Sequence, residues 1–120
     1  MTLRRIITEF GTGNDLHGGD YTKAAVRAVE DAIHHSSLSL IRTLGVDARA
    51  MQVEVTIGVQ QPHRVDVAAV KAALPHGEVT VKPVKGGLEI ANESGNMTVV
   101  ANAAAVVRLE VPEGLGRPRA

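Results

Sequence analysis

A long apolar segment near the C-terminus, Met97–Val111, constrains the fold more than any other feature of the chain. Its pattern predicts extended structure, as one strand or as two, and the alanines and valines of residues 99–107 are apolar on both sides. A strand that is apolar on both faces has to be buried on both. In a chain of 120 residues the second cover is most simply another subunit, so the segment predicts a homo-oligomer.

Four further strands and three helices are predicted around this segment. Met51–Val59 alternates strictly between apolar and polar residues, which is typical of a strand with one buried face. Apolar residues at spacings of three and four, preceded by Asp20 as a good N-cap, predict a helix over Tyr21–His35. The remaining predicted elements are strands at Leu3–Phe10, Glu78–Lys85 and Leu88–Ala91, a main helix at Asp66–Leu74 and a short helix at Leu38–Leu44.

The order of these elements, β-α-(α)-β-α-β-β-β, predicts an α+β domain over residues 1–111. We expect a two-layer mixed β-sheet that carries its two main helices on one face. Within it, Pro83 indicates an edge strand or a bulge, and Gly86-Gly87 can make a tight hairpin turn into Leu88–Ala91. Residues 112–120, rich in Pro, Gly and Arg, are expected to form a flexible tail.

Composition excludes several classes of function. Thirteen basic and thirteen acidic residues balance, so no global field attracts nucleic acid or an anionic membrane. Phe10 and Tyr21 are the only aromatic residues, too few for a base-stacking surface, and the absence of cysteine excludes thiol chemistry. No apolar run approaches the roughly 20 residues of a membrane span. We therefore expect a cytoplasmic protein that needs no cofactor and has neither nucleic acid nor membrane as a partner.

The glycine-rich segment Gly11–Asp20, between a predicted strand and a predicted helix, is the best candidate for a functional loop. A plain strand-to-helix turn needs one or two glycines, and this segment has four. The excess suggests that the backbone approaches something closely, either a ligand or another subunit. His17, whose pKa in free solution is near neutrality, is the best candidate acid or base, and Asp15 could orient it.

Further residues could bind a ligand together with this pair. Lys23, one turn into the helix, could contact an anionic group, or it could be a solvated surface lysine. Asn102 interrupts an apolar run, where a buried amide would either line a pocket or hold a subunit interface. The predicted ligand-binding residues are Gly11, Thr12, Gly13, Asn14, Gly18, Asp20, Lys23, Gln61, His63 and Asn102.

Two more specific interpretations of the segment have less support. Leu16 stands where the third glycine of G-x-G-x-x-G would be, and no Gly-Lys-Ser/Thr follows, so no nucleotide-binding motif is present. Asp15 and His17 could bind a divalent metal ion with His63 or Asp20. The alternative is that they satisfy backbone groups of the turn, and we expect no metal because the spacing matches no established ligand set.

The stretch GTGNDLHGGDYTKAAVRAVEDAI resembles a small family of conserved hypothetical proteins of bacteria and plants, founded on a Listeria protein. Its signature is a Gly-Asp-His-Gly loop that enters an alanine-rich helix. The likeness continues through SLSLIRTLG, MQVEVTIGVQQPH, LPHGEVTVKPVKGGLEI and TVVANAAAVV, and so covers nearly the whole chain. The family has no established activity, so the resemblance implies a fold and a site rather than a reaction.

Two shorter segments, GTG…DYTKAA and TIGVQQPH, are similar to parts of the repeated domain of ring-opening cyclic amide hydrolases, the cyanuric acid hydrolase and barbiturase type. Those enzymes pack three such domains around a central site served by Ser–Lys pairs. Here Gln61 stands at the position of the serine and Thr12 at that of the lysine. The resemblance implies a single-domain relative that forms a trimer, or a multiple of one, without cyclic amide hydrolase activity.

These observations favour a small-molecule-binding homo-oligomer with its site at Gly11–Asp20 near a subunit junction, where an enzymatic role would fall to His17. The alternatives are a non-catalytic structural or interaction protein and a metal-dependent hydrolase.

Overall fold

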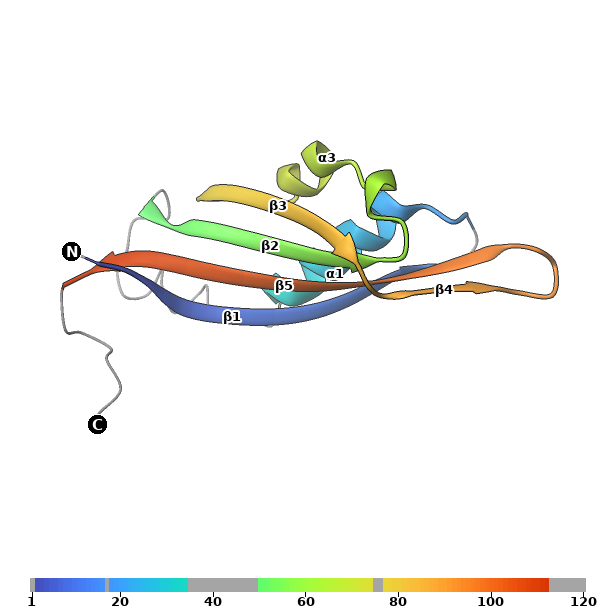
Figure 1. Cartoon of the computed structure of the whole chain (residues 1–120), viewed down its shortest axis with the longest axis horizontal. Coiled ribbons are helices and arrows are strands. Elements are labelled where there is room, and N and C mark those ends of the chain that lie inside the picture. Colours follow the sequence, from blue (N-terminus) through green and yellow to red (C-terminus); the bar gives the residue numbers. More distant parts are fainter. Residues whose placement is uncertain (1, 17, 35–49, 75–76, 113–120) are drawn as a thin grey trace.

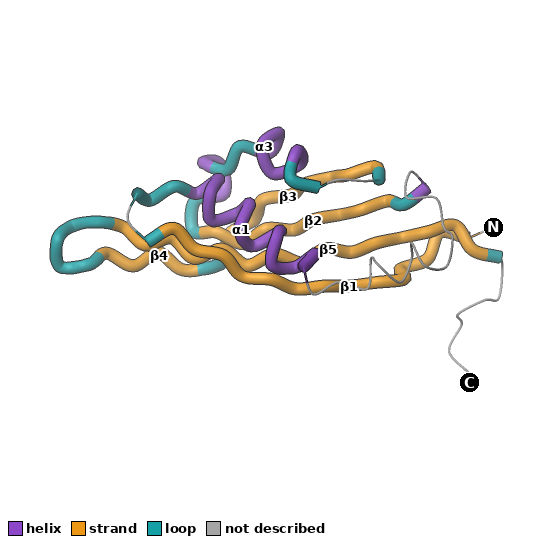
Figure 2. The backbone as a smooth tube through the Cα atoms, turned by 180° about the vertical axis from the view of Figure 1, so that it is seen from behind, coloured by secondary structure: helices purple, strands orange, loops and turns teal. Residues whose placement is uncertain are grey.

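A five-stranded mixed sheet carries both main helices on one side (Figures 1 and 2). The computed structural model describes residues 2–16, 18–34, 50–74 and 77–112. The predicted helix Leu38–Leu44 and residues 113–120 of the predicted tail lie outside these residues. The elements are β1 (Thr2–Asp15), α1 (Tyr21–His34), β2 (Gln52–Val59), the 3-10 turn η2 (Pro62–Arg64), α3 (Val67–Ala72), β3 (Glu78–Lys85), β4 (Leu88–Ala91) and β5 (Met97–Val111). The predicted fold class and element order are confirmed.

Strand β5 is the centre of the sheet, whose strand order is β1-β5-β2-β3. It is one continuous strand of 15 residues, antiparallel to β1 on one side and to β2 on the other, so Val107 lies between Ile7 and Val53. Strands β2 and β3 run parallel, and β4 pairs with the first residues of β5. Met97–Val111, the segment that constrains the fold most, is therefore the strand with which β1, β2 and β4 all pair.

The hydrophobic core lies between the sheet and the helices. The apolar residues of the alternating segment, Met51, Val53, Val55, Ile57 and Val59, are all buried, as predicted. Helix α1 packs on β1 and β5 through a face of small residues, and α3 packs on β3 and α1. No helix among the described residues is long and apolar enough to cross a membrane.

Both helices begin at aspartates that cap them. The side chain of Asp20 accepts a hydrogen bond of 3.0 Å from the backbone N–H of Lys23, and Asp66 accepts one of 3.2 Å from Ala69. An aspartate at this position satisfies a backbone donor that the helix itself leaves without a partner. The start of α1, next to the glycine-rich segment, is therefore fixed by Asp20, as predicted.

Strand β1 is longer than predicted, and this corrects our interpretation of the glycine-rich segment. Residues 11–15 continue the strand to Asp15 instead of forming a loop. Gly11 and Gly13 lie directly under α1: a Cβ atom on either would overlap backbone atoms of Ala28, and on Gly11 also those of Ala32. The close approach that we expected of a ligand or a second subunit is made, at these two glycines, by a helix of the same chain.

The predicted hairpin at Gly86-Gly87 is wrong, because β4 pairs with β5 and not with β3. The two glycines instead carry the chain from the end of β3 past the end of β2. Beyond that point β4 takes the place of β2 as the neighbour of β5. Gly87 has a φ of 60°, and a Cβ atom there would overlap the carbonyl oxygen of Val100. The space between strands, rather than a turn type, requires glycine here.

The position of Pro83 is confirmed. It lies in β3, which pairs only with β2 and so forms an edge of the sheet. A proline lacks the N–H that an inner strand would need, so an edge strand accommodates it.

One face of the sheet carries no described helix, and we call this face, opposite α1 and α3, the open face (Figure 1). In β5 the odd-numbered residues from 99 to 107 are buried under the helices, whereas Val100, Ala104 and Val106 on the open face are half-buried and Asn102 is exposed. The amide of Asn102 is therefore not buried within the single chain, and its role at a pocket or a subunit interface stays a prediction. The single chain buries only one of the two apolar sides of β5.

We expect Gly13→Ala to lower the free energy of unfolding by at least about 3 kcal/mol, the upper part of the range for overpacking. The added methyl group would overlap backbone atoms of α1, which cannot move aside by a change of rotamer. Urea denaturation measures the difference. Gly95→Ala is the control: Gly95 has a φ of 83° and no atom within 4 Å of an added Cβ, so its cost should be only the about 1–2 kcal/mol of a left-handed residue.

Candidate functional site

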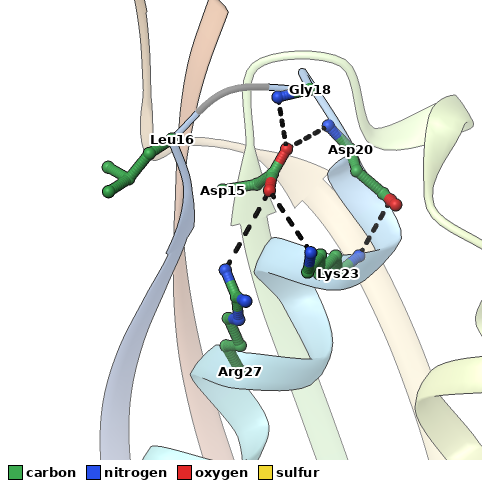
Figure 3. Close-up of a pocket in the computed structure, with 6 residues that line it drawn as sticks. All are labelled: Asp15, Leu16, Gly18, Asp20, Lys23 and Arg27. Atoms are coloured by element: carbon green, nitrogen blue, oxygen red, sulfur yellow. Dashed lines mark hydrogen bonds and ion pairs between the residues drawn. The ribbon is translucent and has the colours of Figure 1, made fainter.

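A cavity of about 430 Å³ lies where β1 ends and α1 begins (Figure 3). It is open to solvent and combines a buried carboxylate with two cationic side chains from the first two turns of α1. The side chain of Leu16 points away from the carboxylate in Figure 3. The lining residues are Asp15, Leu16, Gly18, Asp20, Lys23 and Arg27.

Asp15, the last residue of β1, organises the segment that connects the strand to the helix. Only 6% of the residue is exposed, because its side chain points to the helical side of the sheet. Backbone N–H groups of Gly18 and Asp20 donate to its Oδ2 atom at 3.0 and 2.9 Å. The interpretation of Asp15 as a side chain that satisfies backbone groups of the turn is thus confirmed for one of its two oxygens.

The other oxygen, Oδ1, faces the two cations. The Lys23 Nζ atom and the Arg27 Nη1 atom each lie 4.0 Å from it, and both side chains are about half exposed. That distance is too long for a hydrogen bond. Among the described residues Oδ1 accepts no hydrogen bond, and Lys23 Nζ has no closer partner, whereas Arg27 also donates to the carbonyl oxygen of Asn14 at 2.7 Å. One carboxylate oxygen and one ammonium group therefore converge on the cavity without being hydrogen-bonded.

The surroundings of Asp15 keep it ionised. The backbone N–H of Asp20 is the largest influence and lowers the pKa of the Asp15 carboxyl, and the N–H of Gly18 and the charges of Lys23 and Arg27 lower it further. Burial acts in the opposite direction but does not outweigh them. Near neutral pH the cavity thus contains a carboxylate that can accept hydrogen bonds and cannot donate one.

The structure brings four of the predicted residues together at this cavity: Asp15, Gly18, Asp20 and Lys23. Arg27 also lines the cavity, and the sequence analysis did not include it among the ligand-binding residues. The signal was available, because Arg27 follows Lys23 by four residues and side chains at that spacing lie on one face of a helix.

Other predicted residues serve the fold or lie elsewhere. Gly11 and Gly13 lie against α1, and Asn14 contributes only its carbonyl oxygen to Arg27. Thr12 and Asn102 face the open side of the sheet, and with Phe10 and Asp31 of α1 they line a second depression of about 460 Å³ at the β1 edge of the sheet.

Gln61 and His63 do not line the cavity. The amide of Gln61 donates to the Tyr21 hydroxyl at 3.2 Å and to the Glu89 carboxylate at 2.7 Å, so it connects β4 to the start of α1. His63 is exposed on η2. The single chain thus does not bring these two residues to the cavity, and their role at a site near a subunit junction stays a prediction.

The proposed acid or base, His17, lies outside the described residues, so its role stays a prediction. Among residues 2–16, 18–34, 50–74 and 77–112, no group of three or more His, Asp or Glu side chains is placed to hold a metal ion. The metal site that we considered would have needed His17.

Comparison with known proteins identifies the family. The model of a family described as "conserved hypothetical protein (Lin0512_fam)" matches residues 5–107. The chain belongs to this family. It is also similar to a solved structure from Nostoc punctiforme, described as an FtsZ-like protein of unknown function: 33% of residues are identical, the TM-score is 0.80, and the match covers 92% of this chain and 99% of that one. No curated protein matches the chain. The likeness to cyclic amide hydrolases stays an interpretation of two short segments.

We expect the stability contributed by Asp15 to depend on pH. Its pKa is lowered in the folded protein. The contribution is therefore complete above the ordinary aspartate value of about 3.9 and is lost as the pH falls through the folded-state value. Asp15→Asn should lower the free energy of unfolding by about 2 kcal/mol at pH 7, since it weakens hydrogen bonds to a charged group.

The measurement is urea denaturation of both proteins at pH 7 and at pH 3. The difference between wild type and Asp15→Asn should shrink at pH 3, because the carboxyl of the unfolded chain, with its ordinary pKa of about 3.9, is then mostly protonated. Asp66→Asn, which changes an exposed N-cap to another good N-cap residue, is the control and should cost little at either pH. If Asp15→Asn differed from the wild type by the same amount at both pH values, the lowered pKa of Asp15 in the folded protein would be contradicted.

Proposed function

We propose that this protein binds a small polar molecule in the cavity formed by Asp15, Lys23 and Arg27. The observation that carries the proposal is the arrangement of Asp15 Oδ1 between two cations, each 4.0 Å away and neither hydrogen-bonded to it. A buried carboxylate oxygen normally accepts hydrogen bonds, and a ligand group between it and the cations would supply a donor that no described residue provides.

The chemistry of the three groups defines what such a ligand must offer. Asp15 Oδ1 can only accept a hydrogen bond, whereas the Lys23 ammonium and the Arg27 guanidinium can only donate. A molecule bound between them therefore needs a donor next to an acceptor. An N–H beside a carbonyl oxygen, as in an amide, an imide or a ureide, meets this requirement within one planar group.

Charge favours a neutral ligand over a strongly anionic one. Asp15 and Asp20 balance the charges of Lys23 and Arg27 around the cavity. A phosphate bound by the two cations would lie against the buried Asp15 carboxylate, and like charges in a partly buried site repel. A volume of about 430 Å³ is within the lower part of the range for small-molecule sites, about 300–1,000 Å³.

The similarity of two segments to ring-opening cyclic amide hydrolases suggests the same class of ligand. At the positions of the catalytic serine and lysine this chain has Gln61 and Thr12. Neither side chain offers the nucleophile and base that such a reaction requires. The similarity therefore supports binding of a cyclic amide without its hydrolysis.

The proposal is tested by NMR titration of ¹⁵N-labelled protein with succinimide, hydantoin and uracil, and with phosphate and acetate for comparison. The backbone amides of Gly18 and Asp20 donate to Asp15 and should report binding at its other oxygen. At least one neutral probe should shift both signals to saturation, and it should bind more tightly than either anion.

Lys23→Gln and Arg27→Gln should each weaken binding of that probe by roughly tenfold or more, the value of a hydrogen bond to a charged group. Lys71→Gln, at an exposed lysine of α3, is the matched control and should bind as the wild type does. The proposal fails if no neutral probe shifts these amides, or if the three variants bind equally well.

A further inference from the structure

The open face of the sheet is uncharged along its centre, where the exposed Asn102 stands between Val100 and Ala104, and no described element lies against it. Residues directly opposite in neighbouring strands point to the same side, so Phe10 lies beside Ala104, and Leu88 beside Val100. Phe10 is 70% exposed and Leu88 57%. Large apolar side chains exposed on one face are a feature of interaction sites.

The distribution of charge on this face matches that of a protein–protein interface. The open-face residues from 8 to 14 in β1 and from 98 to 106 in β5 include no charged side chain. Interface cores are depleted of charge and enriched in aromatic residues, while their rims are polar. The charged open-face side chains of the described strands lie around this part, at Arg5, Glu54, Glu78, Lys82, Arg108 and Glu110.

These rim charges suit a second copy of the same chain. Three are positive and three are negative, so two copies that meet through this face do not repel each other. Within one chain Arg108 pairs with Glu54 at 3.6 Å. A nucleic acid or an anionic membrane would require a field of one sign, which this face does not have.

The face also presents both halves of a contact with itself. The ring of Phe10 lies at a depression of about 460 Å³ at the β1 edge of the sheet, which it lines together with Thr12, Asn102 and, from α1, Asp31. Since every copy has both the ring and the depression, the ring of one copy can enter the depression of the next. Such a contact can be repeated reciprocally about a two-fold axis or around a closed ring.

The open face is large enough for a stable interface between two copies of the chain. Strand β5 has 15 residues, about 50 Å at roughly 3.4 Å per residue, and four strands about 4.8 Å apart make the sheet about 15 Å wide. The product, roughly 750 Å², is close to the about 800 Å² that each partner buries in a stable complex.

We infer that a second copy of this chain covers the open face, with Phe10 and Leu88 in the contact. This assembly does not depend on the function proposed for the Asp15 cavity, which opens on the helical side of β1. It places Thr12 and Asn102, two residues expected to bind ligand, inside an interface between subunits. The sequence-based prediction for the number of copies is three or a multiple of three.

The test is the molar mass of the full chain by light scattering during size-exclusion chromatography at 50 μM, followed by a dilution series. We expect the wild type to elute at a multiple of 12.6 kDa. Phe10→Glu and Leu88→Glu should each bring the mass to that of a folded monomer, or raise the concentration of half-dissociation at least tenfold. Both side chains are mostly exposed in the single chain, so neither change removes a core contact.

Val67→Glu is the matched control, because Val67 is also an exposed apolar residue but lies in α3 on the helical side. It should keep the wild-type mass. A wild-type monomer at 50 μM would overturn the inference and would leave the open face to a different partner. A wild-type mass retained by both Phe10→Glu and Leu88→Glu would also overturn it, since the copies would then meet elsewhere. Circular dichroism confirms that the variants are folded.

Discussion

The contact on which the rest of the structure depends is that of β1 with α1, made through Gly11 and Gly13 on one side and Ala28 and Ala32 on the other. Without side chains beyond Cβ, the backbone of the helix comes close enough to the strand that even a methyl group on either glycine would overlap it. Close packing of backbone on backbone fixes how near the helix lies to the strand. The contact therefore fixes the first two turns of α1 over the end of β1, and with them the distances from Lys23 and Arg27 to Asp15.

Much of the fold could be predicted from the sequence because its signals are local. The alternation of Met51–Val59 and the spacing of apolar residues in α1 each describe a buried face that a single element must present. Strand β3 was predicted with its observed bounds, and Pro83 indicated its place at an edge. The prediction that failed, the hairpin at Gly86-Gly87, depends on a partner distant in the sequence. The chain turns back on β3 or crosses the end of β2 according to which strand β4 pairs with, and no residue near the glycines encodes that choice.

The glycine-rich segment shows the same limit at the candidate site. Glycine is compatible with a turn, with a ligand contact and with close packing of backbone on backbone, and the residues around it do not distinguish these roles. Gly11 and Gly13 proved to have the third role, and only residues 16–20 connect the strand to the helix. The prediction of Asp15, Asp20 and Lys23 as neighbours held because the end of a strand and the first turn of the next helix must be adjacent. Gln61 and His63 were expected there from chemistry alone, which does not specify a position in space.

The division of polar and apolar groups between the two sides of β1 follows from the alternation of a strand. Successive side chains point to opposite sides, so the residues that meet α1 and those that meet the open face are interleaved in one short sequence. Asp15 points to the helical side, where helix cations and backbone donors stabilise a buried charge; Phe10 and Thr12 point to the side where no such groups exist. In the assembly that we propose, a carboxylate in place of Phe10 or Thr12 would have to be desolvated against another copy of the chain. A shift of β1 by one residue would exchange the two sets, placing Phe10 under α1 and a charged residue in the apolar contact. The bulge at Ile6 confines such a change of register to the start of the strand, and the two glycines under α1 fix the register beyond it.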